Sequence, residues 1–250
     1  MEHFLETTET IIEGVGFTHY YFLHILWLIL FATATIANII YYRKATPEKR
    51  SQWRKIIAAL LIADELFKMA GLFIGGNYQF SYLPLHLCSI NIFVIAYHSF
   101  KPNRLLDSIL YTVCIPGALA ALLFPSWTSL PLGNFMHIHS FTVHILLALY
   151  PIVLTCGGDI RPKVQDIPKC VGILMAAALP IYLINLLLGT NFMFLMEADA
   201  NNPLFIFKQL FGSHIWGFPI IIAGILIVMF TPWYLYDKHL EKRRGCDKTV

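Results

Sequence analysis

The chain has 250 residues, of which 57% are hydrophobic and only 13% are charged. A soluble domain carries about 25% charged residues, so this composition excludes an ordinary soluble protein and indicates a polytopic membrane protein. The formal net charge of +3 is small and gives no reason to expect a nucleic-acid partner. We expect membrane lipids as the partners, and the sequence does not indicate an oligomeric state.

Apolar stretches long enough to cross a bilayer, about 20 residues each, recur seven times along the chain. The predicted spans are residues 17–42, 54–74, 83–100, 104–124, 137–156, 168–189 and 215–236. Glycine, proline and asparagine separate them, and no internal repeat or soluble domain interrupts the series. The predicted fold is therefore all-α, a polytopic membrane helix bundle that forms one transmembrane domain of seven helices.

Lysine and arginine are distributed unevenly between the predicted loops. Sixteen of the 18 follow the first, third, fifth or seventh span, and the exceptions are Lys68 and Lys208. Because basic residues are retained on the cytoplasmic side, this pattern predicts an external N-terminus and a cytoplasmic C-terminus. The first 16 residues contain four glutamates and no basic residue, which is unlike a signal peptide. We expect a multi-pass protein of the plasma membrane.

The third predicted span carries polar groups inside an apolar run. They are His86, Cys88 and Asn91. A charged side chain in hydrocarbon costs about 2.5 to 3.5 kcal/mol on the insertion scale, so a titratable residue there needs a partner. With the predicted orientation, His86 lies about one helical turn below the outer surface and Cys88 and Asn91 lie deeper.

Other spans place polar residues at the same depth. His137, Ser140 and His144 share one face of the fifth span, because they are three and seven residues apart. The remaining candidates are Asp64 and Lys68 in the second span and Asn185 and Asn191 at the end of the sixth. We expect these groups to converge on a polar pocket in the outer half of the membrane.

Several of these residues also have structural interpretations. Asp64 and Lys68, four residues apart, could neutralise each other as an ion pair, whereas Glu65 would need another partner or a proton. His86 and His144 could each form a hydrogen bond that holds two helices together. Together at one depth, they favour a functional role.

Near the predicted span ends, we expect ordinary interfacial residues. These are His137, His139, Trp127, Trp216 and Trp233, since aromatic side chains gather at membrane interfaces. The spacing of His137, His139 and His144 fits no familiar zinc or iron site, so we predict no metal and no cofactor. The five cysteines are scattered without paired spacing, which predicts no disulfide framework, and Cys114 is expected to serve packing.

Two segments resemble a known family. They are Leu83-Pro84-Leu85-His86-Leu87-Cys88 and, after Asn185, Leu188-Gly189-Thr190-Asn191-Phe192-Met193-Phe194-Leu195. With the later histidine on the fifth span, they resemble the YwaF-type integral membrane family of bacteria over nearly the whole chain. That family is similar, more distantly, to eukaryotic transmembrane acyltransferases that remodel ether phospholipids with a cysteine and a histidine on neighbouring helices.

The resemblance implies the histidine role for His144. In the eukaryotic pattern the cysteine immediately precedes the first histidine; this chain has Leu85 there, and Cys88 follows three residues later on the same predicted helix. We therefore predict a lipid acyltransferase or lipid hydrolase in which Cys88 is the nucleophile and His144 or His86 is the base.

The remaining polar residues receive binding roles in this hypothesis. Lys68 would hold a lipid phosphate, and Asn91 or Asn185 would donate to the developing oxyanion. The predicted substrate-binding set is Asp64, Lys68, Asn91, Asn185 and Asn191. The alternative is a transporter or permease that carries protons or a small solute through the same pocket. A third interpretation, a receptor or scaffold, requires neither turnover nor flux.

Overall fold

A computed structural model describes residues 3–198 and 202–246. Over these residues the chain is helical and contains no strand, which confirms the all-α prediction for this part. The α-helices are α1 (Phe22–Lys44), α2 (Pro47–Ile74), α3 (Leu87–Phe100), α4 (Arg104–Ile109), α5 (Ile115–Leu123), α6 (Phe135–Gly157), α7 (Ile167–Leu188), α8 (Phe205–Phe211) and α9 (Gly217–Cys246).

Six helical segments of the described chain are long and apolar enough to cross a membrane. They are Phe22–Lys44, Phe80–Phe100, Arg104–Leu123, Phe135–Gly157, Val164–Leu188 and His214–Leu235. The remaining predicted span, the second one at residues 54–74, lies within α2, a helix of 28 residues. Its apolar run is interrupted by Asp64, Glu65 and Lys68. The multi-pass architecture therefore has six such segments, and a seventh crossing by α2 stays a prediction.

Three helix starts differ from the predicted boundaries by four residues or more, and the first is that of α1, which begins at Phe22 and not at residue 17. Helix α2 begins at Pro47, seven residues before the predicted start at residue 54, because Thr46 accepts a hydrogen bond from the Lys49 amide and Pro47 occupies the first turn. Helix α3 begins at Leu87, and His86 is its N-terminal flanking residue. Pro84 keeps Leu83 extended, and the turn at Pro84 and Leu85 delays the start of the helix until after His86.

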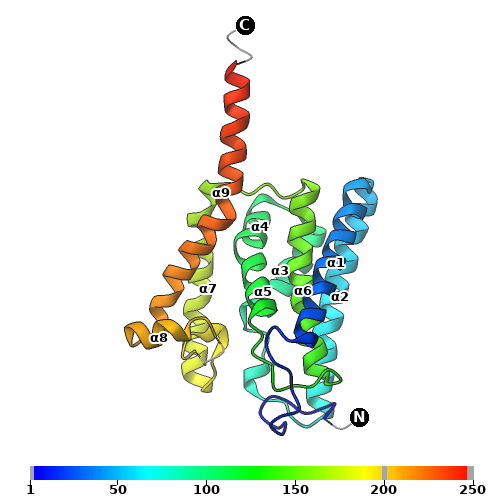
Figure 1. The fold of residues 1–250 in the computed structure, drawn as a ribbon, viewed down its shortest axis with the longest axis vertical. Coiled ribbons are helices and arrows are strands. Elements are labelled where there is room, and N and C mark those ends of the chain that lie inside the picture. Colours follow the sequence, from blue (N-terminus) through cyan, green and yellow to red (C-terminus); the bar gives the residue numbers. More distant parts are fainter. Residues whose placement is uncertain (1–2, 199–201, 247–250) are drawn as a thin grey trace.

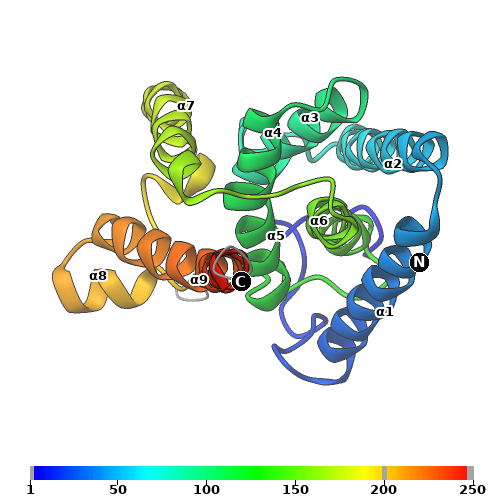
Figure 2. The ribbon, with the colours of Figure 1, turned by 90° about the horizontal axis from the view of Figure 1, so that it is seen from above.

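Helix α6 is the centre of the bundle. Viewed along the bundle, α1, α2, α3 and α5 surround it (Figure 2). One close approach needs a glycine: a Cβ atom on Gly71 of α2 would lie 2.3 Å from the Phe135 ring at the start of α6. Since hydrophobic exclusion gives little drive between helices in lipid, such close packing holds them together.

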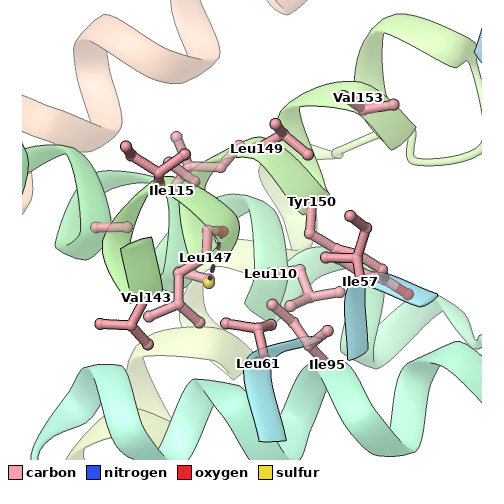
Figure 3. Close-up of a cluster of buried hydrophobic side chains, with 14 of the residues drawn as sticks. Ile57, Leu61, Ile95, Leu110, Ile115, Val143, Leu147, Leu149, Tyr150 and Val153 are labelled. Carbon is pink, nitrogen blue, oxygen red and sulfur yellow. Dashed lines mark hydrogen bonds between the residues drawn. The ribbon is translucent and has the colours of Figure 1, made fainter. Parts of the chain in front are cut away.

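Buried apolar side chains fill the seams around α6. Ile57 and Leu61 from α2, Ile95 from α3 and Leu147 from α6 lie together in one cluster (Figure 3). Between α4 and α5, residues Leu110–Cys114 form a π-helical segment. The Cys114 thiol donates to the Leu147 carbonyl oxygen at 3.4 Å. Cys114 is buried, which confirms its predicted packing role.

Helices α7, α8 and α9 form an arm beside α4 and α5, away from α1 and α2 (Figures 1 and 2). The Tyr111 hydroxyl ties the arm to the bundle by donating to the Met229 carbonyl oxygen at 2.7 Å. The connection after α7 turns back toward the start of α3, where Met193 contacts His86. The arm therefore contributes residues to the region that contains Cys88.

The two ends of the bundle differ in charge. At one end, Arg50 and Arg54 bind Asp159, and Arg104 binds Asp166. The N-terminal residues pack at the opposite end (Figure 1). We call these the basic end and the N-terminal end. Basic residues that the sequence separates widely thus meet at one end, whereas the orientation of that end in a membrane stays a prediction.

Candidate functional site

Helices α3 and α6 bring a thiol and an imidazole into contact. The Nε2 atom of His144 lies 3.2 Å from Sγ of Cys88, and Nδ1 of His144 lies 2.6 Å from the carbonyl oxygen of Ser140. Because a carbonyl oxygen only accepts hydrogen bonds, neutral His144 carries its proton on Nδ1. Its Nε2 lone pair therefore faces the thiol and can accept the thiol proton.

The second predicted base, His86, lies at the N-cap position of α3. Its Nδ1 accepts a long hydrogen bond of 3.4 Å from the Met193 amide, and its ring meets the Phe192 ring edge-on at 5.2 Å. The contacts of His86 are thus with the connection after α7, whereas His144 contacts the thiol. The structure favours His144 over His86 as the partner of Cys88.

The connection after α7 is held by two asparagine amides. Oδ1 of Asn185 accepts from the Phe192 amide at 2.8 Å, and its Nδ2 donates to the Phe192 carbonyl at 3.0 Å. Asn191 binds Met196 and Glu197 backbone groups in the same way. Both amides predicted to bind substrate are therefore engaged with the backbone, and their binding role stays a prediction.

These hydrogen bonds hold an unusual backbone conformation. Met193 and Phe194 both have left-handed φ angles, of 58° and 55°, which costs about 1 to 2 kcal/mol for each non-glycine residue. His214 helps to fix the segment, since its Nε2 lies 3.0 Å from the Phe194 carbonyl oxygen. Such local strain beside polar groups is common at functional sites.

Asn91 differs from these engaged amides. It follows Cys88 by three residues on α3, so the two side chains share a face. Asn91 is only 3% exposed, and within the described residues its side-chain amide forms no hydrogen bond. A buried amide with free donors next to a thiol is available to bind an oxygen atom of a ligand.

The buried charges of α2 are paired differently from our prediction. Lys68 forms an ion pair with Glu65, three residues away, and not with Asp64. Asp64 is instead engaged by α6: Nδ1 of His139 lies 3.2 Å from its Oδ2, and the Thr142 hydroxyl donates to its Oδ1 at 3.0 Å. Because these α6 groups bind Asp64, Glu65 is left to pair with Lys68.

His137 and His139 lie inside the protein, and their predicted depth at the membrane interface stays a prediction. The side chains are buried, with exposures of 0% and 6%, because α6 is enclosed by its neighbours. His137 accepts a hydrogen bond from Nε1 of Trp27 at 3.0 Å and pairs with the Leu130 carbonyl oxygen through Nδ1 at 2.9 Å. Both ring nitrogens of His137 therefore have hydrogen-bond partners, which indicates a structural role.

Trp127 is only 7% exposed, and its predicted place at a membrane interface stays a prediction. Its indole ring stacks on the His144 imidazole, with centroids 5.3 Å apart and an angle of 9° between the planes. Its Nε1 atom is buried and donates to no group in the described chain. No residue pattern predicts this contact, because Trp127 lies in the connection between α5 and α6.

A second histidine network lies toward the basic end of the bundle. The two nitrogens of His98 lie 2.8 Å from the Tyr150 hydroxyl and 2.8 Å from Oδ1 of Asp107. A cavity of about 260 Å³ adjoins this network; its lining residues are Arg54, His98, Pro102, Asn103, Asp107, Leu154 and Asp159. Among the described residues, no three His, Cys, Asp or Glu side chains are arranged to hold a metal ion.

Comparison with known proteins gives one match. A model of a protein family, the TMEM164 family, matches residues 16–236, a range that includes α1 to α8 and most of α9. No curated protein and no solved structure matches the chain. The matched range contains Cys88, His144, Asn91 and Trp127.

Proposed function

The chain belongs to the TMEM164 family, and on this premise we propose that it is a membrane-embedded lipid acyltransferase using Cys88 and His144. The observation that carries the proposal is the 3.2 Å separation between the Cys88 thiol and the unprotonated nitrogen of His144. A thiol needs an adjacent base to become a nucleophile in apolar surroundings. The similarity to eukaryotic ether-phospholipid acyltransferases, which implies a cysteine and a histidine, supports this reaction class.

In the first half-reaction, His144 Nε2 takes the proton from Cys88 as the sulfur attacks the carbonyl carbon of a lipid ester. The ester C–O bond then breaks, and the departing lipid alkoxide takes the proton from His144. The products are a free lipid hydroxyl and an acyl group joined to Cys88 by a thioester bond. No oxidant, reductant or metal is required for this exchange.

In the second half-reaction, the hydroxyl of an acceptor lipid attacks the thioester. His144 takes the hydroxyl proton, a new ester bond forms, and the proton returns to the Cys88 sulfur as the thioester bond breaks. Water in place of the acceptor would make the protein a lipid hydrolase. The apolar surroundings of the site support transfer between lipids over hydrolysis.

Asn91 is the residue we assign to the developing oxyanion. Its amide is buried and unengaged within the described chain, one turn from Cys88. A donor preorganised toward developing charge contributes about 10²- to 10³-fold in rate where it has been removed by mutation. Because Lys68 and Asp64 already have partners, we assign both a structural role beside the site. Lys68 is therefore not assigned to the lipid phosphate.

We further propose that α2 is the seventh membrane crossing and that the site lies in the outer half of the plasma membrane. The gathering of basic residues at the end opposite the N-terminal residues supports this orientation. A cysteine introduced near residue 77 should then react with an impermeant maleimide on intact cells, whereas Cys156 should not. The reverse labelling would overturn the orientation.

The function is tested by acyl exchange in proteoliposomes of the purified full chain. One phospholipid carries an isotope-labelled acyl chain and a second, a lysophospholipid, accepts it. We expect labelled product with the wild type, none with Cys88→Ala or His144→Gln, and wild-type amounts with Cys156→Ala, which changes an exposed cysteine. Undiminished exchange by Cys88→Ala would overturn the proposal.

One observation favours the alternative, a proton-coupled transporter. Asp64, Glu65, Lys68 and His139 form a buried charged cluster between α2 and α6, and Oδ2 of Asp64 and Oε2 of Glu65 accept no hydrogen bond. Ionisable groups within a membrane often mark a proton path. Proton flux into proteoliposomes that disappears with Asp64→Asn, together with absent acyl exchange, would favour this function.

A further inference from the structure

The aromatic ring that covers His144 is held in place by several contacts. Trp127 lies face to face with His144 and meets the Phe141 ring edge-on, with centroids 5.2 Å apart. Phe141 in turn stacks on Trp27 at 4.8 Å and 3°. The position of Trp127 is therefore fixed by the connection between α5 and α6 and by packing against the aromatic side chains between α1 and α6.

The N-terminal segment clamps the connection that carries Trp127. The Phe17 amide donates to the Thr128 carbonyl oxygen at 2.8 Å. Gly16 permits this approach, since a Cβ atom there would lie only 2.0 Å from the same oxygen. Leu130 adds a second anchor, because its carbonyl oxygen pairs with Nδ1 of His137 at 2.9 Å.

The stacked geometry has a chemical consequence. The face of an indole ring carries negative electrostatic potential and attracts a cation. His144 becomes a cation when it takes the Cys88 proton, so the contact with Trp127 strengthens at the step that produces the thiolate. A leucine or methionine at residue 127 would fill space but could not supply this attraction.

Other groups also act on His144 and must be kept constant in any test. Its nearest titratable neighbours are Asp64 on α2, His139 on α6, His86 at the start of α3, and Cys88 itself. Lys68 of α2 lies near His86. None of these residues stacks on the His144 ring, so a change at Trp127 removes the contact with the ring face and leaves these titratable groups in place.

We propose that Trp127 is a positioning residue that holds the His144 ring by its face and stabilises its protonated form beside the Cys88 thiolate. This inference rests on the proposed function, because it assigns the imidazole of that same site a partner. It adds a residue from outside the membrane-spanning helices to the cysteine and histidine. It also gives the N-terminal segment a role, since Gly16 and Phe17 hold the connection that carries the indole.

The test measures how readily the Cys88 thiol ionises, through its rate of alkylation, and not acyl exchange. The purified full chain in nanodiscs is treated with iodoacetamide between pH 6 and 10, and alkylation of the Cys88 peptide is followed by mass spectrometry. We expect Trp127→Met to slow alkylation about fivefold at pH 7, the size of a partly buried cation–π contact. The ratio of the two rates should move toward one as the pH rises, because more of the thiol then ionises without passing its proton to His144, and Trp127→Phe should fall between them.

Trp53→Leu is the matched control, since Trp53 is equally buried and stacks on Tyr150 toward the basic end; it should leave Cys88 alkylation unchanged. Equal rates for Trp127→Met and wild type at pH 7, or a ratio of the two rates that stays the same at every pH, would overturn the inference. If the Met variant does not fold, the Phe variant decides by the same criteria. Unchanged alkylation in His144→Gln would instead overturn the proposed function.

Discussion

The same two helices, α3 and α6, join two buried histidines to partners at different depths of the bundle. In the basic half, His98 of α3 bonds to Tyr150 of α6 and to Asp107. In the other half, His144 of α6 bonds to the Ser140 carbonyl and faces the Cys88 thiol of α3. The imidazole of His98 thus has two oxygen hydrogen-bond partners, and the imidazole of His144 has one.

This difference separates a structural histidine from a reactive one. Oxygen partners at both nitrogens fix the position of His98, and leave no lone pair free for chemistry. A thiol is only a weak hydrogen-bond donor, so Nε2 of His144 keeps its capacity to take a proton. Trp127, which stacks on His144, shares this incomplete bonding, since its Nε1 atom binds no group in the described chain.

The largest expected effect comes from exchanging each histidine for glutamine. His144→Gln should lower acyl exchange by at least about 10²-fold, the usual contribution of a general base, with little change in stability. His98→Gln should lower the free energy of unfolding by about 1 to 3 kcal/mol, because Tyr150 or Asp107 loses its partner. Acyl exchange per folded molecule should then be retained. Thermal unfolding and exchange assays on both variants check this, and the opposite assignment of effects would contradict it.

The buried pair Glu65–Lys68 should contribute to stability, as His98 does, and not to acyl exchange, as His144 does. Lys68→Met leaves the Glu65 carboxylate without its partner, which costs about 3 to 5 kcal/mol for a buried pair. The double variant Glu65→Gln with Lys68→Met removes both charges and should recover most of this loss. Thermal unfolding of the two variants measures the difference. If the double variant is as unstable as the single one, the pair does more than neutralise charge.

A smaller effect is expected at the N-terminal clamp. Gly16→Ala forces the connection after α5 away from the N-terminal segment, and such overpacking costs about 1 to 3 kcal/mol. Cys88 alkylation at pH 7 should slow as well, because Trp127 moves with that connection. Gly133→Ala is the control, since a Cβ atom there meets no atom within 4 Å. Equal behaviour of the two variants would show that the clamp does not position Trp127.

The smallest effect concerns acid stability at the N-terminal end. Partial burial opposes ionisation of Glu9, but hydrogen bonds from Tyr82 and from the Thr7 and Thr8 hydroxyls outweigh it and lower the pKa of Glu9. A lowered pKa stabilises the fold above the unfolded-state value of about 4.3, and this contribution is lost as the pH falls through the folded-state value. For a solvent-exposed group the contribution is a few tenths of a kcal/mol, at about the scale of surface pairs.

Tyr82→Phe should remove most of this acid dependence, measured by thermal unfolding between pH 5.5 and 3. Tyr78→Phe is the matched control, because within the described residues the Tyr78 hydroxyl forms no hydrogen bond. The acid dependence should persist in this control. A wild-type acid response in Tyr82→Phe would remove Tyr82 as its cause.

Much of the fold follows from residue patterns. The apolar runs predict the helices because each span must satisfy its own backbone hydrogen bonds. The convergence of Cys88 and His144 could be predicted because both lie at a similar depth, in the third and fifth predicted spans. Helix α3 begins later than predicted, since hydropathy alone does not register the turn at Pro84 and Leu85 that precedes His86.

The remaining features depend on contacts between segments far apart in the chain. Glu65 and Asp64 are both within reach of Lys68 on a helix, and only the approach of α6 decides between them. Trp127 was missed because its position depends on Gly16 and Phe17, more than 100 residues earlier. No pattern within the connection itself indicates that contact.

The most direct test of the central claim is detection of the acyl group on Cys88. The purified full chain in nanodiscs containing acyl-labelled phospholipid is digested, and the Cys88 peptide is analysed by mass spectrometry before and after treatment with hydroxylamine, which cleaves thioesters. We predict a labelled acyl adduct on Cys88 that hydroxylamine removes and that is absent in His144→Gln. An active wild-type preparation whose Cys88 peptide carries no acyl group, under conditions that trap thioesters, would contradict the account.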